Sequence, residues 1–136
     1  MVVSNSDQNV ELAKRAVDAW NGGDLNRWME CFDEDIVWIP LPNVPDLKPT
    51  HGREAMLELI QQWLEPWDRY DVETLELADH GDTVIWTARH LAFQKRSGMA
   101  LDQSMSAVFV FREGRIAEFQ IFPNKEEALE AARLRD

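Results

Sequence analysis

Residues 83–122 read TVIWTARHLAFQKRSGMALDQSMSAVFVFREGRIAEFQIF, and this stretch decides the fold. Apolar and polar side chains alternate along three runs, at about 83–94, 99–111 and 115–122, and a fourth such run precedes them at about 71–78. Alternation of this kind is typical of strands that bury one face. Segments rich in turn residues separate the runs at 79–82, 97–98 and 113–114. The sequence therefore predicts a four-stranded antiparallel meander.

The turns also predict which side chains share a face. A two-residue Ser97-Gly98 turn would pair His90 with Met105 across the hairpin. A three-residue loop at 112–114, with Gly114 left-handed, would bring the last run onto the same face. The face then contains Trp86, Ala88, His90, Met105, Ala107, Phe109, Ala117, Phe119 and Ile121. It is apolar except at His90.

Helical patterns surround the meander. Residues 9–20 carry the apolar stripe of an amphipathic helix, which ends at Gly22-Gly23. Asp24 is expected to cap a second short helix, in which apolar residues keep helical spacing as far as Phe32. Residues 36–39 resemble a short strand, and four prolines between 40 and 49 predict a stiff loop. A third helix is expected at about 53–64, and a last one from Asn124, with Glu127 as its capping-box partner.

The resulting order, α-α-β-α-β-β-β-β-α, predicts an α+β fold. We expect a curved, mostly antiparallel sheet shaped like a cone, with helices packed on its concave face. A chain of 136 residues is long enough for one domain. The expected organisation is a flexible N-terminal tail at residues 1–8 and a single domain at 9–136.

Composition limits the partners. The net charge of −11 disfavours nucleic acid and anionic membranes, and no run approaches the length of a spanning helix. The N-terminus lacks the features of a signal peptide, so we expect a cytoplasmic protein. Cys31 is the single cysteine, so no internal disulfide is expected, and no cluster of ligating residues predicts a metal or other cofactor.

Several segments resemble the SnoaL-like family of the nuclear transport factor 2-like superfamily. They are AVDAWNGGDL at 16–25, FDEDIVW at 32–38, HGREAM at 51–56 and IFPNKEEALEAA at 121–132. PLP at 40–42 is similar to limonene epoxide hydrolase, and the overall order is distantly similar to ketosteroid isomerase. The resemblance implies a cone that encloses a pocket. It does not fix an activity, because this superfamily hosts isomerases, hydrolases, cyclases and non-catalytic proteins.

The catalytic positions of those relatives are mostly apolar here. Aligned on the shared landmarks, the tyrosine and two aspartates of ketosteroid isomerase fall on Ala16, Ala107 and Ile39. The Asp-Arg-Asp set of limonene epoxide hydrolase falls on His90, Ala88 and Ile121. SnoaL-type cyclases use a histidine and an aspartate as acid and base. Of these two residues, only the histidine has a counterpart here, at His90.

His90 is therefore the candidate catalytic residue, as a general acid or base. The alternative is a buried histidine with a backbone or hydroxyl partner. Burial without a nearby carboxylate should lower its pKa, and a polar neighbour such as Asp102, Gln103 or Ser104 would favour catalysis. The expected ligand-binding residues are Trp20, Trp38, Trp63, Trp86, Met105, Ala107, Phe109, Phe119 and Ile121. Their alternative role is core packing.

Two functions remain open at this point. The first is binding of a small apolar or polycyclic organic molecule by a cofactor-free cyclase, isomerase or hydrolase that uses His90. The second is a non-catalytic ligand-binding or dimer-scaffold protein. A homodimer is expected in either case, because Ile85, Leu91, Phe93, Val108 and Phe122 would form an apolar outer face of the sheet.

Overall fold

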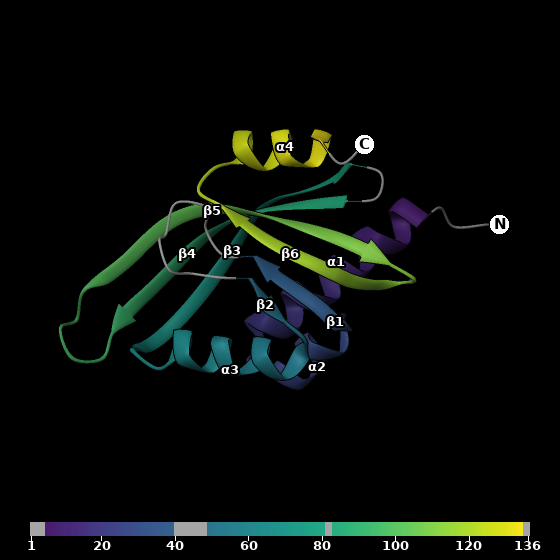
Figure 1. The fold of residues 1–136 in the computed structure, drawn as a ribbon. Helices are drawn as coiled ribbons and strands as arrows, with labels where there is room; N and C mark the ends of the chain where they lie inside the picture. Colours follow the sequence, from purple (N-terminus) through teal and green to yellow (C-terminus); the bar gives the residue numbers. More distant parts are fainter. Residues whose placement is uncertain (1–4, 40–48, 81–82, 135–136) are drawn as a thin grey trace.

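The structure is a computed structural model that describes residues 5–39, 49–80 and 83–134. The helices and the strands of a single curved sheet follow the predicted order, with one strand more than predicted, at Thr50–His51 (Figure 1). The elements are α1 (Asn5–Asn21), α2 (Leu25–Glu30), β1 (Phe32–Ile39), β2 (Thr50–His51), α3 (Arg53–Leu64), β3 (Trp67–His80), β4 (Thr83–Gln94), β5 (Ala100–Arg112), β6 (Arg115–Phe122) and α4 (Lys125–Leu134). The α+β class predicted from the sequence is confirmed.

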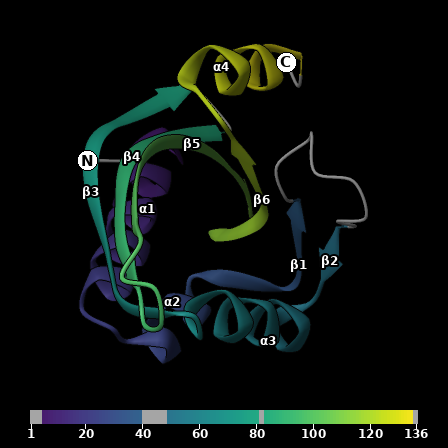
Figure 2. The same cartoon turned by 90° about the vertical axis from the view of Figure 1, so that its left-hand side faces the viewer.

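The strands of the described residues lie in the order β2-β1-β6-β5-β4-β3. Strands β3 to β6 form the predicted antiparallel meander, and β1 joins it by parallel pairing with β6. Figure 2 shows that the sheet curls strongly, so that β3, β4 and β5 face β1 across an interior space. The sheet is therefore mixed and cone-like.

The main hydrophobic core lies on the concave face. Helices α1, α2 and α3 contribute Ala16, Trp28 and Ile60 to it, and the sheet contributes residues such as Phe109 and Ile116. In Figure 2, α2 and α3 lie across the open side of the curve. Helix α2 starts as expected: the Asp24 carboxylate accepts the backbone N–H of Arg27 at 3.1 Å.

Helix α4 packs on the opposite, convex face (Figure 1). Its Ala128 and Ala132 cover Ile85, Val108 and Phe122, which are all buried. The Asn124 side chain caps the helix through the backbone N–H of Glu127 at 2.9 Å, as predicted. The expectation that Ile85, Val108 and Phe122 are exposed on the outer face is wrong, because the apolar side of α4 packs on them. Leu91 stays half-buried and Phe93 exposed, and the homodimer stays a prediction.

The predicted register of the β4–β5 hairpin is wrong by two residues. Gln94 and Met99 flank a four-residue connection in which Gly98 is left-handed, so His90 lies opposite Gln103 rather than Met105. Since side chains alternate with a period of two, a shift of two keeps every residue on its predicted face. The next turn also differs: Glu113 and Gly114 form a two-residue connection with positive φ at both residues.

Some boundaries differ from the sequence-based expectation. Helix α1 begins at Asn5, so residues 5–8 of the expected tail are helical, and residues 1–4 lie outside the described part. Phe32 begins β1 instead of extending α2. The proline-rich loop at 40–49 lies outside the described residues except for Pro49. Within the described residues, no helix combines the length and the apolar character that crossing a membrane requires.

The two outer-face phenylalanines allow a direct test of how α4 is placed. Phe122 lies under α4 and is 6 % exposed, whereas Phe93 is 53 % exposed. We expect Phe122→Ala to lower the free energy of unfolding by about 3–5 kcal/mol, and Phe93→Ala by less than about 1 kcal/mol. Urea unfolding monitored by circular dichroism measures both. Equal losses would contradict the placement of α4.

Candidate functional site

A cavity of about 350 Å³ lies between the concave face of the sheet and the helices. Apart from Thr50, Tyr70 and His90, the side chains around it are aliphatic, thioether, tryptophan or phenylalanine groups. The residues that line it are Trp20, Trp28, Trp38, Thr50, Leu59, Ile60, Trp63, Tyr70, Trp86, His90, Met105, Phe119 and Ile121. No carboxylate, lysine or arginine of the described residues is among them. The cavity is thus an apolar space with a small polar spot.

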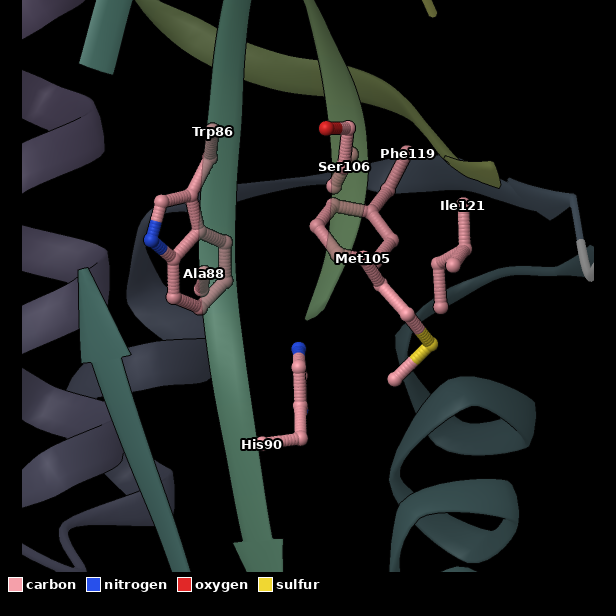
Figure 3. Close-up of a pocket in the computed structure, with 8 residues that line it drawn as sticks. Trp86, Ala88, His90, Met105, Ser106, Phe119 and Ile121 are labelled. Carbon is pink, nitrogen blue, oxygen red and sulfur yellow. The ribbon is translucent and has the colours of Figure 1, made fainter. Parts of the chain in front are cut away.

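A recess of about 30 Å³ adjoins this cavity and shares His90, Trp86 and Met105 with it. Figure 3 shows the indole of Trp86 on one side and Met105 with Ile121 on the other. The imidazole of His90 lies below and between them, with a ring nitrogen directed into the gap. The recess has room for a group about the size of one water molecule. A small polar substituent of a ligand could therefore reach His90.

Strand β4 positions the histidine. Residues two apart on a strand face the same side, so Trp86, Ala88 and His90 all point into the concave space. The intervening Arg89 points to the other face, where it forms a bidentate ion pair with Asp102 at 2.8 and 2.7 Å. This alternation is why a basic residue and a cavity histidine are neighbours in sequence without being neighbours in the site.

His90 has a hydrogen-bond partner on the neighbouring strand. The hydroxyl oxygen of Tyr70 on β3 lies 2.7 Å from Nδ1 of His90, and the two rings meet edge to face at 5.7 Å. In the ladder Tyr70 lies opposite Ala92 and Val72 lies opposite His90, so the two rings meet diagonally. This hydrogen bond links a side chain of β3 to a side chain of β4 at the cavity wall.

Burial keeps both members of the pair uncharged. Loss of hydration lowers the pKa of His90 from 6.5 to about 4. Loss of hydration also raises the pKa of Tyr70 to about 12, although a hydrogen bond with the Trp63 indole acts in the opposite direction. At neutral pH the site therefore holds a neutral imidazole bonded to a protonated phenol.

The polar neighbours expected from the sequence are not the ones present. Asp102, Gln103 and Ser104 are all exposed, and the Asp102 carboxylate is bound to Arg89 on the outer face. Tyr70 was missed because the strand was expected to begin at about 71, four residues after its observed start at Trp67. One signal could have found it: Tyr70 is the single tyrosine in a chain with six tryptophans and six phenylalanines. A lone phenol among so many apolar rings suggests a hydroxyl with a specific partner.

Most of the expected ligand-binding residues do line the cavity. They are Trp20, Trp38, Trp63, Trp86, Met105, Phe119 and Ile121, and Ala107 lines the adjoining recess. Phe109 lines neither space, because it is fully buried behind Trp86, with the two rings stacked at 5.9 Å. The sequence missed Trp28, Thr50, Leu59, Ile60 and Tyr70.

The aromatic walls hold each other in place. The ring centroid of Trp20 lies 5.0 Å from that of Trp28 and 6.2 Å from that of Tyr70. The ring centroids of Trp38 and Phe119 are 4.5 Å apart. Such contacts fix ring orientation in addition to burying area. Within the described residues, no three ligating side chains lie close enough to hold a metal ion. The buried thiol of Cys31 has a raised pKa, mainly from desolvation, which keeps it protonated.

A comparison with models of protein families identifies the family. A model of the SnoaL-like domain matches residues 13–119, which is most of the chain. The protein belongs to the SnoaL-like domain family. A search of the curated proteins finds no match.

Solved structures show the same fold. Bal32a, from a soil-derived mobile gene cassette, is 27% identical with a TM-score of 0.77 and covers 87% of this chain and 90% of its own. A candidate SnoaL-like polyketide cyclase from Jannaschia sp. CCS1 is 23% identical with a TM-score of 0.78, covering 97% and 96%. TerC, co-crystallised with polyporic acid, is 12% identical with a TM-score of 0.74, covering 93% and 98%. These likenesses establish the nuclear transport factor 2-like fold of this SnoaL-like domain.

The lowered pKa of His90 predicts a specific loss of stability in acid. Below about pH 6.5 the unfolded chain protonates His90, whereas the folded chain resists protonation down to about pH 4. Stability from this source is complete above pH 6.5 and declines as the pH falls to about 4, by roughly 1–3 kcal/mol. Urea unfolding of the wild type and of His90→Phe at pH 7 and pH 4.5 measures it.

Carboxylates titrate in the same range in both proteins, so the difference between the two pH slopes isolates His90. We expect the wild type to lose more stability than His90→Phe on acidification. Parallel slopes would show that the imidazole is solvated in the folded protein.

Proposed function

We propose that this SnoaL-like domain binds a small, largely apolar organic molecule in the cavity and carries out acid–base chemistry on it through His90, without a cofactor. The supporting observation is the Tyr70–His90 hydrogen bond at the wall of an otherwise apolar space. Cyclisation, isomerisation and hydrolysis are the reaction classes that such a group can serve.

The size of the cavity favours a ligand of two or three rings. Ligand pockets commonly span roughly 300–1,000 Å³, and an apolar cavity of about 150 Å³ already accommodates benzene. The volume here is about 350 Å³. Its tryptophan and phenylalanine walls match the faces of flat ring systems. The names of two structural neighbours agree with this class: one is a candidate polyketide cyclase, and TerC was crystallised with polyporic acid.

The chemistry follows from the uncharged state of the pair. A neutral imidazole can hydrogen-bond to a ligand oxygen near neutral pH and so assist the transfer of a proton to or from the ligand. Because the cavity has a low dielectric constant, a hydrogen bond from His90 to a ligand is stronger there than in water. The site therefore suits proton transfer at one polar position of a mainly apolar molecule.

A second function, binding without catalysis, has one observation in its favour. No carboxylate among the described residues lines the cavity, although the catalytic relatives considered above depend on such groups. A binding protein would use the same aromatic walls and the same polar spot. The two functions differ in whether His90 changes the rate of a reaction.

The ketone 1-tetralone separates these functions, because it carries two fused rings, a carbonyl group and exchangeable α-protons. Quenching of tryptophan fluorescence measures binding, and NMR in D₂O measures α-proton exchange. We expect binding by the wild type and exchange faster than in buffer. His90→Phe should lower the exchange rate by about 10²-fold or more, which is the scale of general acid–base catalysis.

Two variants serve as controls for that experiment. Leu59→Phe narrows the cavity and should weaken binding about tenfold, whereas Met99→Ala changes an exposed position and should leave both measurements unchanged. Binding without accelerated exchange would favour the non-catalytic function. No binding of 1-tetralone at millimolar concentration would contradict a cavity for this class of ligand.

We also propose that two chains associate through the part of the sheet that α4 leaves uncovered. Phe93 and Leu75 are each 53 % exposed, and an interface that covered them would remove apolar side chains from water. Light scattering at micromolar concentration should give twice the mass of the chain, and Phe93→Asp should shift it toward the single mass. A wild-type protein of single-chain mass would contradict the dimer.

A further inference from the structure

We propose that Tyr70 fixes His90 as a hydrogen-bond donor toward the cavity, so that the site selects molecules whose polar group is an acceptor oxygen, such as a ketone, ester or quinone carbonyl. Tyr70 is in this view a positioning residue. The inference rests on the proposed function for the role of the cavity, and it adds the direction of the hydrogen bond and the chemical class of the ligand.

The direction starts at the phenol of Tyr70. A phenol can donate one hydrogen bond through its own hydrogen. The oxygen of Tyr70 carries this hydrogen, because Tyr70 remains protonated far above neutral pH. The hydrogen of the phenol is thus available to be donated.

The acceptor for that hydrogen is Nδ1 of His90, which lies 2.7 Å from the phenol oxygen. In the reverse arrangement Nδ1–H would donate to the same oxygen. The phenol hydrogen and the lone pair of Nε2 would then both need a further partner in a space lined mainly by apolar side chains, whereas the first arrangement leaves only the hydrogen on Nε2 for a ligand. An unmade hydrogen bond at a buried site is costly, so the first arrangement is favoured.

The tautomer of His90 follows. A neutral imidazole carries one hydrogen, and since Nδ1 accepts from Tyr70, the hydrogen is on Nε2. Burial keeps the ring neutral, and no carboxylate of the described lining residues is available to reverse the arrangement. Nδ1 is taken by Tyr70, so Nε2–H is the group that a ligand meets. His90 lines both the cavity and the recess shown in Figure 3.

The donor sets the ligand class. A carbonyl oxygen accepts a hydrogen bond from Nε2–H, whereas a ligand whose one polar group is a donor would face another donor. In this tautomer His90 has no free lone pair to take a proton from the ligand. It acts by stabilising an oxygen that gains negative charge during enolisation or attack at the carbonyl carbon, and in enolisation the α-proton passes to water or buffer base. The rest of the ligand must be apolar, because the described lining offers few other polar groups. The favoured ligand is therefore a ring system with a carbonyl placed near the recess.

The tautomer can be measured directly, without any ligand. Long-range ¹H–¹⁵N correlation spectra of uniformly ¹⁵N-labelled full-length protein at pH 7 distinguish the two neutral forms by the shifts of their ring nitrogens. His90→Phe identifies the signals of His90 among those of His51 and His80. We expect a protonated Nε2 and an accepting Nδ1 at His90. A protonated Nδ1 in the wild type would overturn the proposal.

Tyr70→Phe tests whether Tyr70 positions the imidazole. This change removes the hydroxyl group and keeps the ring, so the walls of the cavity stay filled. We expect the single tautomer to be replaced by a mixture with averaged ¹⁵N shifts. Unchanged shifts in Tyr70→Phe would mean that another group sets the tautomer, and would overturn the role of Tyr70.

The ligand class is tested with 1-tetralone and tetralin, which share a ring system and differ by one carbonyl group. After correction for their different partition from water into octanol, the wild type should prefer 1-tetralone by about threefold to tenfold, as one hydrogen bond in a dry site allows. His90→Phe should remove the preference while still binding both. Equal corrected affinities in the wild type would overturn the donor assignment. If neither compound binds, the proposed function fails, and the NMR spectra still decide the tautomer.

Discussion

The pairing of β3 with β4 is the contact on which the site depends. The ladder runs from Trp67 opposite Gln94 to His80 opposite Thr83, with irregular register near both Arg69 and Thr74. Backbone hydrogen bonds along such a ladder fix where each side chain projects. Through them Tyr70 is held diagonal to His90, and Trp86 is held where its indole donates to the Thr74 hydroxyl at 2.9 Å. A slip of one residue in this ladder would separate the phenol from the imidazole.

The shape of the sheet then decides what surrounds that pair. A strongly curled sheet leaves more space on its concave side than its own side chains fill, and the helices close that space with large rings. Among the described residues, the indole N–H groups of Trp28 and Trp67 are buried in this packing and have no hydrogen-bond partner. Each unmade hydrogen bond costs roughly 1–3 kcal/mol. The burial of large aromatic area in the walls offsets this cost.

The sequence could predict the elements of the fold better than their connections. Alternation along β4 and β5 correctly predicted that Trp86, Ala88 and His90 lie on the inner face. The register error of two residues did not change this prediction, because side chains alternate with a period of two. Turn lengths were less predictable, because Lys95 and Arg96 carry no turn signal and yet belong to the β4–β5 connection. The site of α4 could not be predicted either, since its apolar stripe fits any exposed apolar surface.

The candidate site was predictable in composition and less so in detail. Periodicity identifies the face to which Phe109 and Phe119 belong, but it cannot tell which ring borders the cavity and which is covered by another ring. Contacts between distant segments set that difference. The partner of His90 was missed for the same reason: Tyr70 is twenty residues away, and its approach depends on how β3 pairs rather than on any local pattern.

Neutrality is the property that distinguishes this site from one built on carboxylates. The chain carries a net charge of −11, yet the described wall of the cavity contains no ionised group at neutral pH. Selection inside it therefore depends on shape and on hydrogen bonding rather than on an ion pair. A cationic imidazole would attract anionic ligands and hold water, and burial prevents that form above about pH 4. The low pKa of His90 is thus the condition under which a single hydrogen bond can orient an uncharged ligand, because no stronger charge interaction competes with it.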